Sequence, residues 1–540
     1  MISGLAAASH PVLALGAVGA VGKVLAASQD TSPAIPTPSI EYRALSPFLV
    51  VFGLGLLGVL VEAFVPQRLR RALQPTLVVV GFAIALVLVA LLHGRRAVLA
   101  VGSVAIDGPA LFLEGTILVL AAASVLLMAE PRVNALVARA SVLPGTRGAR
   151  EQAGSSELQT EAYPLMAFAV AGMMLFAASN TLLVMFVALE ILSLPLYLMA
   201  GLARRRRLLS QEAALKYFLL GAFSSAFFLY GLALLYGYAG TVSLGGIADA
   251  AGALGSNTAL LYLGLGLLGV GLLFKVGAAP FHSWTPDVYQ GSPTPVTAFM
   301  AAGTKVAAFG ALIRVLYVSF GGLRWDWRPV VWAVAIITML LGAVVAITQR
   351  DVKRMLAYSA IAHAGFILVG VAATSTKGLS GAMFYLVTYG FTTIAAFGVV
   401  TLVRRGNEEA GDLSAWQGLG RRAPLLAGTF AFLLLALAGI PLTSGFTGKF
   451  AVFSAAIAGH ATVLVVIGLV ASAVAAFFYV RVIVLMFFSE PAAEGPVVAQ
   501  ASPLTYAAIA LGAAVTLVLG VFPQPLLDLA DSAARLGFVR

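Results

Sequence analysis

The feature that most constrains this chain is a succession of apolar runs, each about 20 residues long, separated by short polar or Pro/Gly-containing segments. A helix needs about 20 mostly apolar residues to cross the hydrocarbon core of a bilayer. Fourteen such runs can be counted, with approximate limits 46–65, 74–93, 109–129, 162–179, 181–202, 211–238, 259–281, 294–319, 329–348, 352–374, 378–403, 424–457, 461–488 and 503–524. This pattern predicts an all-α polytopic membrane protein with about 14 transmembrane helices.

Composition indicates the same fold class and excludes several functions. Of the 540 residues, 61% are hydrophobic and only 10% are charged, whereas soluble domains carry about 25% charged residues. The chain has no cysteine, which excludes disulfides, thiolate metal sites and cysteine-ligated iron–sulfur clusters within it. The net charge of +11 comes from clusters in short loops, so a nucleic-acid partner, which needs a basic face, is not expected.

The basic residues of the loops predict the orientation of the chain. Connections after odd-numbered runs contain Arg68, Arg70, Arg71, Arg132, Arg139, Arg147, Arg150, Arg204, Arg205, Arg206, Arg207, Arg350, Lys353, Arg354, Arg404, Arg405, Arg421 and Arg422. Connections after even-numbered runs contain only Arg95, Arg96, Arg324, Arg328 and Lys377. Since cytoplasmic loops are enriched in Arg and Lys, both termini are predicted on the outer face.

The runs also divide the chain into segments. We expect an N-terminal extension in 1–44, peripheral or flexible, three spans in 45–129 and a cytoplasmic loop in 130–161. Spans 4–8 (162–320) and 9–13 (329–489) are expected to form two inverted five-helix repeats, each with a broken helix, before a last span and tail in 490–540. Pro280 and Pro441 each interrupt an apolar run beside a lysine. Since proline removes a helical hydrogen bond, each run is expected to contain a broken helix.

Four of the seven lysines lie inside apolar runs: Lys216, Lys275, Lys305 and Lys449. A charge at the centre of a membrane helix costs roughly 2.5–3.5 kcal/mol on insertion scales, so the four together cost about 10–14 kcal/mol. Ionisable residues at such positions usually belong to ion pathways. The alternative is snorkelling to the membrane surface, which is the preferred explanation for Arg314 and Arg481 because they lie nearer the ends of their runs.

Two further residues complete the candidate site. Glu190 lies about 21 Å along a helix from Arg204, and Lys216 lies about 13 Å from Arg207 on the next, antiparallel run. Their embedded positions predict that they can meet as a mid-membrane ion pair. For His363, a histidine that packs between helices and a histidine that relays protons are equally consistent with the sequence.

These residues predict a row of titratable groups at mid-depth: Glu190, Lys216, Lys275, Lys305, His363 and Lys449. Burial favours the neutral form of a lysine, so a moving neighbouring charge can make it accept a proton from one side and release it to the other. The Gly-x-Gly-x-x-Gly matches at Gly53 and Gly264 lie inside apolar runs and indicate close helix packing. No nucleotide, zinc, haem or redox motif is recognisable, so the energy must come from an ion gradient or a partner subunit.

The segments around these residues resemble those of a known family. They are LEILSLPL (189–196), EAALKYF (212–218), FKVGAAPFHSWTPDVYQG (274–291), GTKVA (303–307), RMLAYS (354–359) and AGIPLTSGFTGKF (438–450). Over roughly residues 45–525 the chain resembles the proton-pumping, antiporter-like membrane subunits of bacterial NADH-quinone oxidoreductase, respiratory complex I.

The resemblance implies a proton-translocating subunit driven by quinone reduction elsewhere in the complex. Glu190 and Lys216 would be a charge pair, Lys275 and Lys305 a central relay, and Lys449 the terminal site. No cofactor would bind to this chain; NADH, FMN, iron–sulfur clusters and a menaquinone or ubiquinone are expected in partner subunits. The partners would be a neighbouring antiporter-like subunit and small membrane subunits in the bacterial inner membrane. A subunit of a secondary Na⁺/H⁺ antiporter, or a scaffold whose lysines only lock helix packing, are the alternatives.

Overall fold

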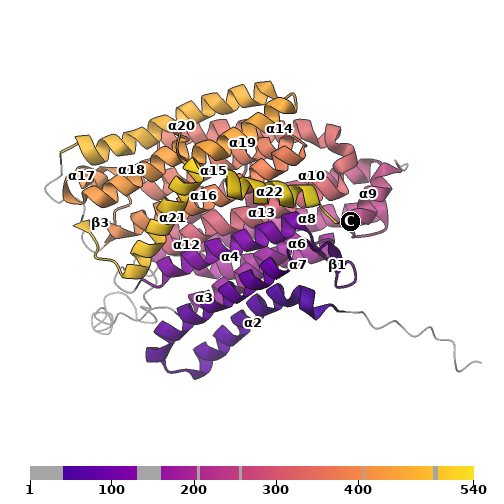
Figure 1. Cartoon of the computed structure of the whole chain (residues 1–540), viewed down its shortest axis with the longest axis horizontal. Helices are drawn as coiled ribbons and strands as arrows, with labels where there is room; N and C mark the ends of the chain where they lie inside the picture. The colour runs from indigo at the N-terminus through magenta and orange to yellow at the C-terminus, as the bar shows by residue number, and fades with distance from the viewer. Residues whose placement is uncertain are drawn as a thin grey trace, which may run out of the picture. The chain divides into compact units, whose positions relative to one another are not determined.

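The apolar runs fold as α-helices, many of them running roughly side by side (Figure 1). The computed structural model describes residues 40–130, 160–202, 207–253, 258–405, 408–490 and 497–539. Nearly all of the predicted N-terminal extension and of the predicted loop 130–161 therefore lies outside the described residues. From Glu41 onward, these residues form one compact unit.

The first eight spans are formed by the following elements. They are α2 (Tyr42–Phe64), α3 (Gln67–Leu91), α4 (Gly108–Met128), α6 (Ala162–Ala178), α7 (Leu182–Ala200), α8 (Arg207–Ala239), α10 (Thr258–Val276) with α11 (Trp284–Gly291), and a helix made of α12 (Thr294–Phe299), the π-helical η2 (Met300–Thr304), α13 (Lys305–Arg314) and the π-helical η3 (Val315–Ser319). The remaining spans are α14 (Arg324–Ile347), α15 (Val352–Ala372), α16 (Thr376–Leu402), α18 (Pro424–Ala438) with α19 (Ser444–Ala458), α20 (Thr462–Phe488) and α21 (Pro503–Val521).

The span count agrees with the sequence. Within the described ranges, 12 helices are long and apolar enough to cross a membrane, and α6 and α18 are shorter apolar helices. With α11 and α19 taken as the second halves of broken helices, these make 14 spans. The prediction of an all-α polytopic membrane protein with about 14 transmembrane helices is confirmed.

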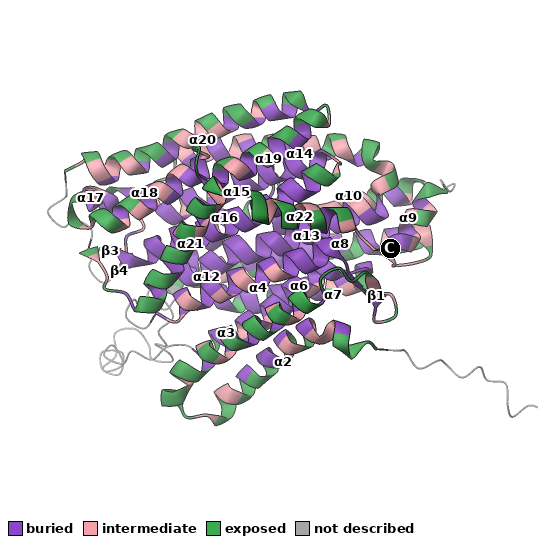
Figure 2. Ribbon diagram, in the orientation of Figure 1, coloured by how far each residue is buried: buried purple, intermediate pink, exposed green. Residues whose placement is uncertain are grey.

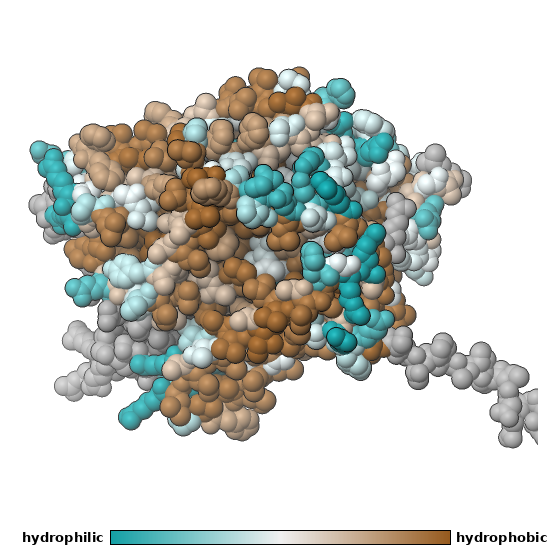
Figure 3. Space-filling model, viewed as in Figure 1, coloured by the Kyte–Doolittle hydropathy of each residue, from teal (hydrophilic) through white to brown (hydrophobic). Residues whose placement is uncertain are grey.

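Short elements connect and cover the spans. They are the antiparallel hairpin β1 (Ala97–Leu99) and β2 (Val104–Ile106), the helix α9 (Leu244–Gly252), the 3₁₀ turns η4 (Gly321–Leu323) and η5 (Leu413–Trp416), the helix α17 (Leu419–Arg422), the sheet of β3 (Val403–Arg405) between β4 (Glu408–Glu409) and β5 (Val497–Val498), and the helix α22 (Gln524–Leu536). Ala97 pairs with Ile106 in the hairpin. Asp531 on α22 binds Lys377 at the start of α16. In Figure 3, hydrophilic side chains gather over α22 while apolar ones cover much of the same face.

Capping residues set where several spans begin. Asp107, Thr181, Asp351 and Ser375 each precede a helix, and each side chain accepts a hydrogen bond from a backbone N–H of the first turn. Because these N–H groups have no partner within the helix, the caps satisfy donors that would otherwise be left unpaired.

The core lies where the candidate site residues are. In Figure 2 the central helices α13 and α16 are largely buried, whereas α2, α3, α20 and α21 carry many exposed residues. The most apolar 18-residue stretches of Thr294–Ser319 and α16 are completely buried and that of α15 is 94% buried, against 28% for α21. The helices that carry Lys305 and His363 are thus surrounded by protein.

Two spans are interrupted at the places where the sequence has Pro280 and Pro441. In each case the first half ends at a glycine in the left-handed region, Gly277 with φ 77° and Gly439 with φ 89°. Left-handed backbone ends a helix at little cost only for glycine. After the first break the chain forms α11, which ends at Gly291, beyond the approximate limit of 281 given for the seventh apolar run.

Candidate functional site

Lys275 lies one residue before the end of α10, at the first helix break. Its side chain is buried, and Nζ donates a hydrogen bond of 2.7 Å to Ser193 Oγ on α7. The rings of Tyr197 and Tyr217 have their centroids 5.4 Å from the same nitrogen. Glu190, one turn before Ser193 on α7, interacts electrostatically with Lys275 and leaves its buried Oε1 without a hydrogen bond.

The predicted ion pair between Glu190 and Lys216 does not form in the structure. Lys216 Nζ lies 2.7 Å from Glu212 Oε1, one turn earlier on α8, and 2.7 Å from Asp287 Oδ2 on α11. The prediction was wrong because counting residues gives the depth of a side chain but not the direction in which it leaves the helix. Glu190 interacts electrostatically with Lys275 instead.

Lys305 lies at the start of α13, directly after the π-helical turn. Its buried Nζ donates to the carbonyl oxygens of Ala360 on α15 (2.9 Å) and of Val276 (3.3 Å). Val276 is the last residue of α10, where the helix break leaves carbonyl groups without an intrahelical partner. The break therefore supplies an acceptor for Lys305 directly beside Lys275.

Lys449 repeats this arrangement at the second helix break. Its buried Nζ donates to the carbonyl oxygens of Leu437 (3.2 Å) and Ala438 (2.8 Å), the last two residues of α18, and to Ser472 Oγ (2.8 Å). The ring of Phe366 lies beneath it, with the centroid 4.7 Å away. Both breaks thus present the carbonyl end of a half-helix to a lysine, a position that the partial negative charge of a helix C-terminus favours.

His363 lies between these two lysines and interacts electrostatically with both Lys449 and Lys305. Its ring nitrogens are each in contact with a tyrosine hydroxyl: Nδ1 with Tyr385 (2.9 Å) and Nε2 with Tyr479 (3.3 Å). Tyr385 and Tyr479 were not among the residues singled out in the sequence. Nothing distinguishes a tyrosine inside an apolar run from one that only packs, so no sequence signal could have found them.

A small polar cavity lies next to this region. Its volume is about 10 Å³, close to the minimum for one water molecule, and its lining includes Ser359, Tyr389 and Thr393. Ser359 shares a hydrogen bond with the hydroxyl of Tyr479. The Thr393 hydroxyl is among the groups lining this cavity, so a water molecule here would find a polar partner.

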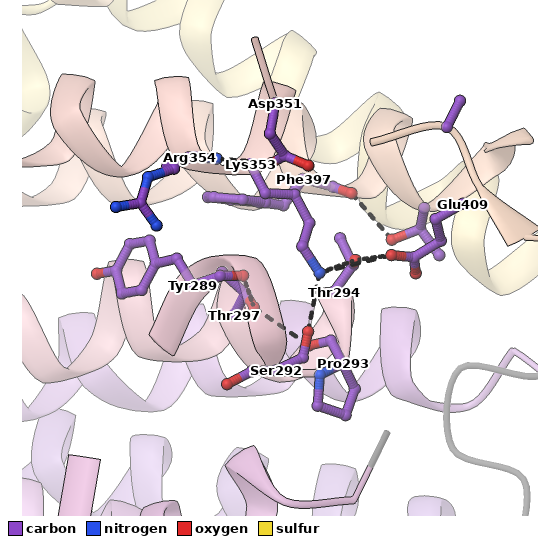
Figure 4. Close-up of polar contacts among 12 residues, drawn as sticks. Tyr289, Ser292, Pro293, Thr294, Thr297, Asp351, Lys353, Arg354, Phe397 and Glu409 are labelled. Carbon is purple, nitrogen blue, oxygen red and sulfur yellow. Dashed lines mark hydrogen bonds and ion pairs between the residues drawn. The ribbon is translucent and has the colours of Figure 1, made fainter. Parts of the chain in front are cut away.

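The start of α15 carries a separate buried cluster, shown in Figure 4. Lys353 Nζ donates to the Ser292 carbonyl (2.9 Å) and to Thr294 Oγ1 (3.1 Å), and lies 3.5 Å from Glu409 Oε2. The Thr294 hydroxyl donates to the same carboxylate oxygen at 2.7 Å. The sequence analysis grouped Lys353 with the basic residues of the loops. In the structure it is only 3% exposed, because β4 brings Glu409 over the start of α15.

Arg314 does not snorkel, in contrast to the expectation for its position near the end of a run. Its guanidinium is completely buried, and Nη2 lies 2.8 and 2.9 Å from the two carboxylate oxygens of Asp107. The sequence could not show this pairing, because Asp107 and Arg314 are 207 residues apart. Arg481 is exposed and donates to the carbonyl of Ile347 at 2.9 Å.

The candidate site combines buried amines, an imidazole and a carboxylate, which are groups that bind and release protons. No group of three or more His, Cys, Asp or Glu side chains that could hold a metal ion occurs within the described ranges. Fold and site together define a class: a polytopic membrane protein of the antiporter-like type, in which two broken helices place buried lysines inside the helical bundle.

Comparison with known proteins identifies the family within this class. Residues 179–475 match the model of a protein family described as "NADH:quinone oxidoreductase/Mrp antiporter, TM". The NADH-quinone oxidoreductase subunit N of Parafrankia sp. (strain EAN1pec) is 71% identical over 517 residues, covering 95% of this chain and 98% of the relative. That of Rhodococcus opacus (strain B4) is 59% identical, covering 93% and 97%. The chain belongs to the NADH-quinone oxidoreductase subunit N family, as the sequence motifs predicted.

Solved structures agree with this family. A chain of respiratory complex I from Thermus thermophilus with bound aureothin is 35% identical, with a TM-score of 0.72, covering 90% of this chain and 99% of that one. A chain of the Mrp complex from Dietzia sp. DQ12-45-1b has a TM-score of 0.75 at 21% identity and covers 92% and 97%, respectively, which shows a shared fold.

Proposed function

We propose that this chain translocates protons across the cell membrane as a subunit of NADH-quinone oxidoreductase, along the row Glu190, Lys275, Lys305, His363 and Lys449, with Lys216 beside its start. Partner subunits would hold NADH, FMN, the iron–sulfur clusters and the quinone, and quinone reduction there would drive the protons. The other membrane subunits of the complex, including a neighbouring antiporter-like subunit, would be its direct partners.

The observation that carries the proposal is the partner set of three buried lysines. Among the described residues, Lys275, Lys305 and Lys449 bind only hydroxyl and carbonyl oxygens, and no carboxylate forms an ion pair with any of them. A charged amine in a low-dielectric interior is costly without a counter-charge. Both protonation states are therefore accessible, which a proton carrier requires and a purely structural lysine does not.

Contacts connect these amines into one row. Lys305 donates to the carbonyl of Val276, the residue that directly follows Lys275 in the sequence. The other acceptor of Lys305, the Ala360 carbonyl, is one helical turn before His363 on α15. His363 in turn interacts electrostatically with Lys449. A proton taken up at one amine raises the cost of charging the next, so charge can advance stepwise.

The same chemistry disfavours sodium as the transported ion. Na⁺ needs oxygen ligands with negative charge or strong dipoles, whereas the row consists mainly of amines that repel a cation when protonated. Of the six candidates, only Glu190 offers a carboxylate. Gradient-driven Na⁺/H⁺ exchange therefore fits the site less well than proton transfer.

The test is to replace Lys275 with Met and measure NADH-driven acidification of inverted membrane vesicles. Met keeps most of the side-chain volume but cannot bind a proton. We expect proton pumping to be abolished or sharply lowered in the assembled complex, and the same result for Lys449→Met. Lys377→Met is the control, because this lysine is exposed and lies outside the row; it should pump normally. Normal pumping by assembled Lys275→Met complex would refute the proposal.

A further inference from the structure

Asp287 is a carboxylate outside the proposed row, and its two oxygens hold cations from different parts of the chain. Lys216 Nζ lies 2.7 Å from Oδ2, and Arg354 Nη1 lies 2.5 Å from Oδ1. Lys216 belongs to α8, Arg354 to α15, and Asp287 to α11, which packs against both helices. Asp287 therefore links the two five-span segments that the sequence predicts to be repeats.

The triad of Lys216, Asp287 and Arg354 is only partly buried, which suits ion pairs that can rearrange. The side chains of Lys216, Asp287 and Arg354 are 42%, 28% and 32% exposed, whereas the Arg314–Asp107 pair is completely buried. Partly hydrated ion pairs are weak compared with buried ones. The triad can therefore rearrange when a charge nearby in the lysine row changes.

Each cation also has a second partner within reach. Lys216 Nζ lies 2.7 Å from Glu212 Oε1, and Arg354 Nη1 donates to Gln290 Oε1 at 3.2 Å. If either cation leaves Asp287, it keeps a hydrogen-bond acceptor. A single carboxylate with two competing cations makes their occupancies interdependent: when Lys216 moves away to Glu212 alone, the attraction between Asp287 and Arg354 is no longer shared.

Both ends of the triad are connected to the lysine row through neighbouring residues. Tyr217, next to Lys216, has its ring centroid 5.4 Å from Lys275 Nζ and is stacked at 4.8 Å on Trp284, the first residue of α11. On the other side, Arg354 is in the first turn of α15, six residues or about 9 Å before Ala360, whose carbonyl accepts from Lys305.

We propose that Asp287 is a positioning residue that couples the position of Lys216 in the first segment to α15 in the second, and through α15 to Lys305. The inference rests on the proposed proton translocation and adds a coupling element to it. It assigns the acidic residue of the Trp-Thr-Pro-Asp segment to coordination between the two halves of the protein.

The experiment compares Asp287→Asn with Asp531→Asn in the assembled complex. Asp531 is a matched control, because it also pairs with a lysine and joins two helices, but it lies on α22, outside the row. The readout is the number of protons moved per NADH oxidised. We expect Asp287→Asn to lower this ratio about fivefold, the lower end of typical coupling between linked sites. Asp287→Glu should restore most of it, and Asp531→Asn should leave it unchanged.

The results separate coupling from structural damage and from the proposed function. An unchanged ratio in assembled Asp287→Asn complex, or an equal fall in Asp531→Asn, overturns the inference. If Asp287→Asn does not assemble, Arg354→Gln and Lys216→Met decide, since each leaves Asp287 with one cation; both should lower the ratio, and two unchanged ratios overturn the inference. If Lys275→Met abolishes pumping while Asp287→Asn pumps normally, only the coupling is wrong; if Lys275→Met pumps normally, proton translocation itself is wrong.

Discussion

At the scale of single residues, the protein contains two chemically different kinds of buried cation. Arg314 forms two hydrogen bonds with a completely buried carboxylate, whereas Lys275, Lys305 and Lys449 have only neutral oxygen partners among the described residues. The guanidinium of Arg314 thus has a counter-charge beside it, and none of the three lysines has an ion-pair partner among the described residues. We therefore expect the arginine to stabilise the structure, whereas the three lysines are the groups that the proposed function requires to change charge.

This distinction predicts a large loss of stability on changing Arg314 to Met. The substitution leaves Asp107 buried without its counter-charge, which typically costs about 3–5 kcal/mol. Arg481→Met is the comparison, because Arg481 is exposed and donates only to a backbone carbonyl. Thermal denaturation of the purified complexes should show a clear decrease for Arg314→Met and little change for Arg481→Met. Equal stability of the two variants would show that the buried pair is not structurally important.

The sequence identified the embedded residues but not their partners. Lys275, Lys305 and Lys449 could be found because charges are rare inside apolar runs. The partners of Lys216 and Arg314 could not be found, because pairing depends on how each helix is rotated and on contacts between distant segments. Ser193, Tyr385 and Tyr479 carry no charge, so nothing in their runs sets them apart.

At the scale of elements, the two broken helices place backbone carbonyls where the lysines need acceptors. A lysine beside a proline inside an apolar run predicted both interruptions. It did not predict that α11 resumes the seventh span, nor the helices α9 and α22, because these are short and their faces are only partly apolar. Local sequence therefore shows where a helix stops more readily than where it starts again.

The break in the second segment predicts a specific effect of Gly439→Ala. Gly439 has φ 89°, and an added Cβ would lie 3.0 Å from Lys449 Cδ and 3.1 Å from its Nζ. The left-handed conformation alone costs a non-glycine residue about 1–2 kcal/mol, and the methyl group would displace the amine from the Leu437 and Ala438 carbonyls. We expect lower proton pumping in assembled complex. Gly428→Ala on the same helix, where a Cβ meets nothing within 4 Å, should pump normally; equal pumping by both would show that the amine position is not critical.

At the scale of the whole molecule, direction of transport depends on which ends of the spans face the cytoplasm. Arg68 and Arg71 lie in α3 at the α2–α3 connection, the first of the Arg-rich connections of the sequence, while Arg95 and Arg96 follow α3 at its opposite end. Because basic residues are retained in the cytoplasm, the α2–α3 connection is predicted inside and the β1–β2 hairpin outside. Asp287 and Lys353 would then lie toward the inner side, and Asp107 and Arg314 toward the outer side.

The absence of cysteine from the chain allows a direct test of this orientation. A single introduced cysteine is the only thiol of this subunit, so labelling with a membrane-impermeant maleimide reports one position. Arg68→Cys and Arg95→Cys are suitable because both residues are exposed and lie outside the helical spans or at their ends. In right-side-out vesicles, Arg95→Cys should be labelled at once, and Arg68→Cys only after permeabilisation. The reverse pattern would place both termini in the cytoplasm and would show that the orientation predicted from the Arg and Lys bias is wrong.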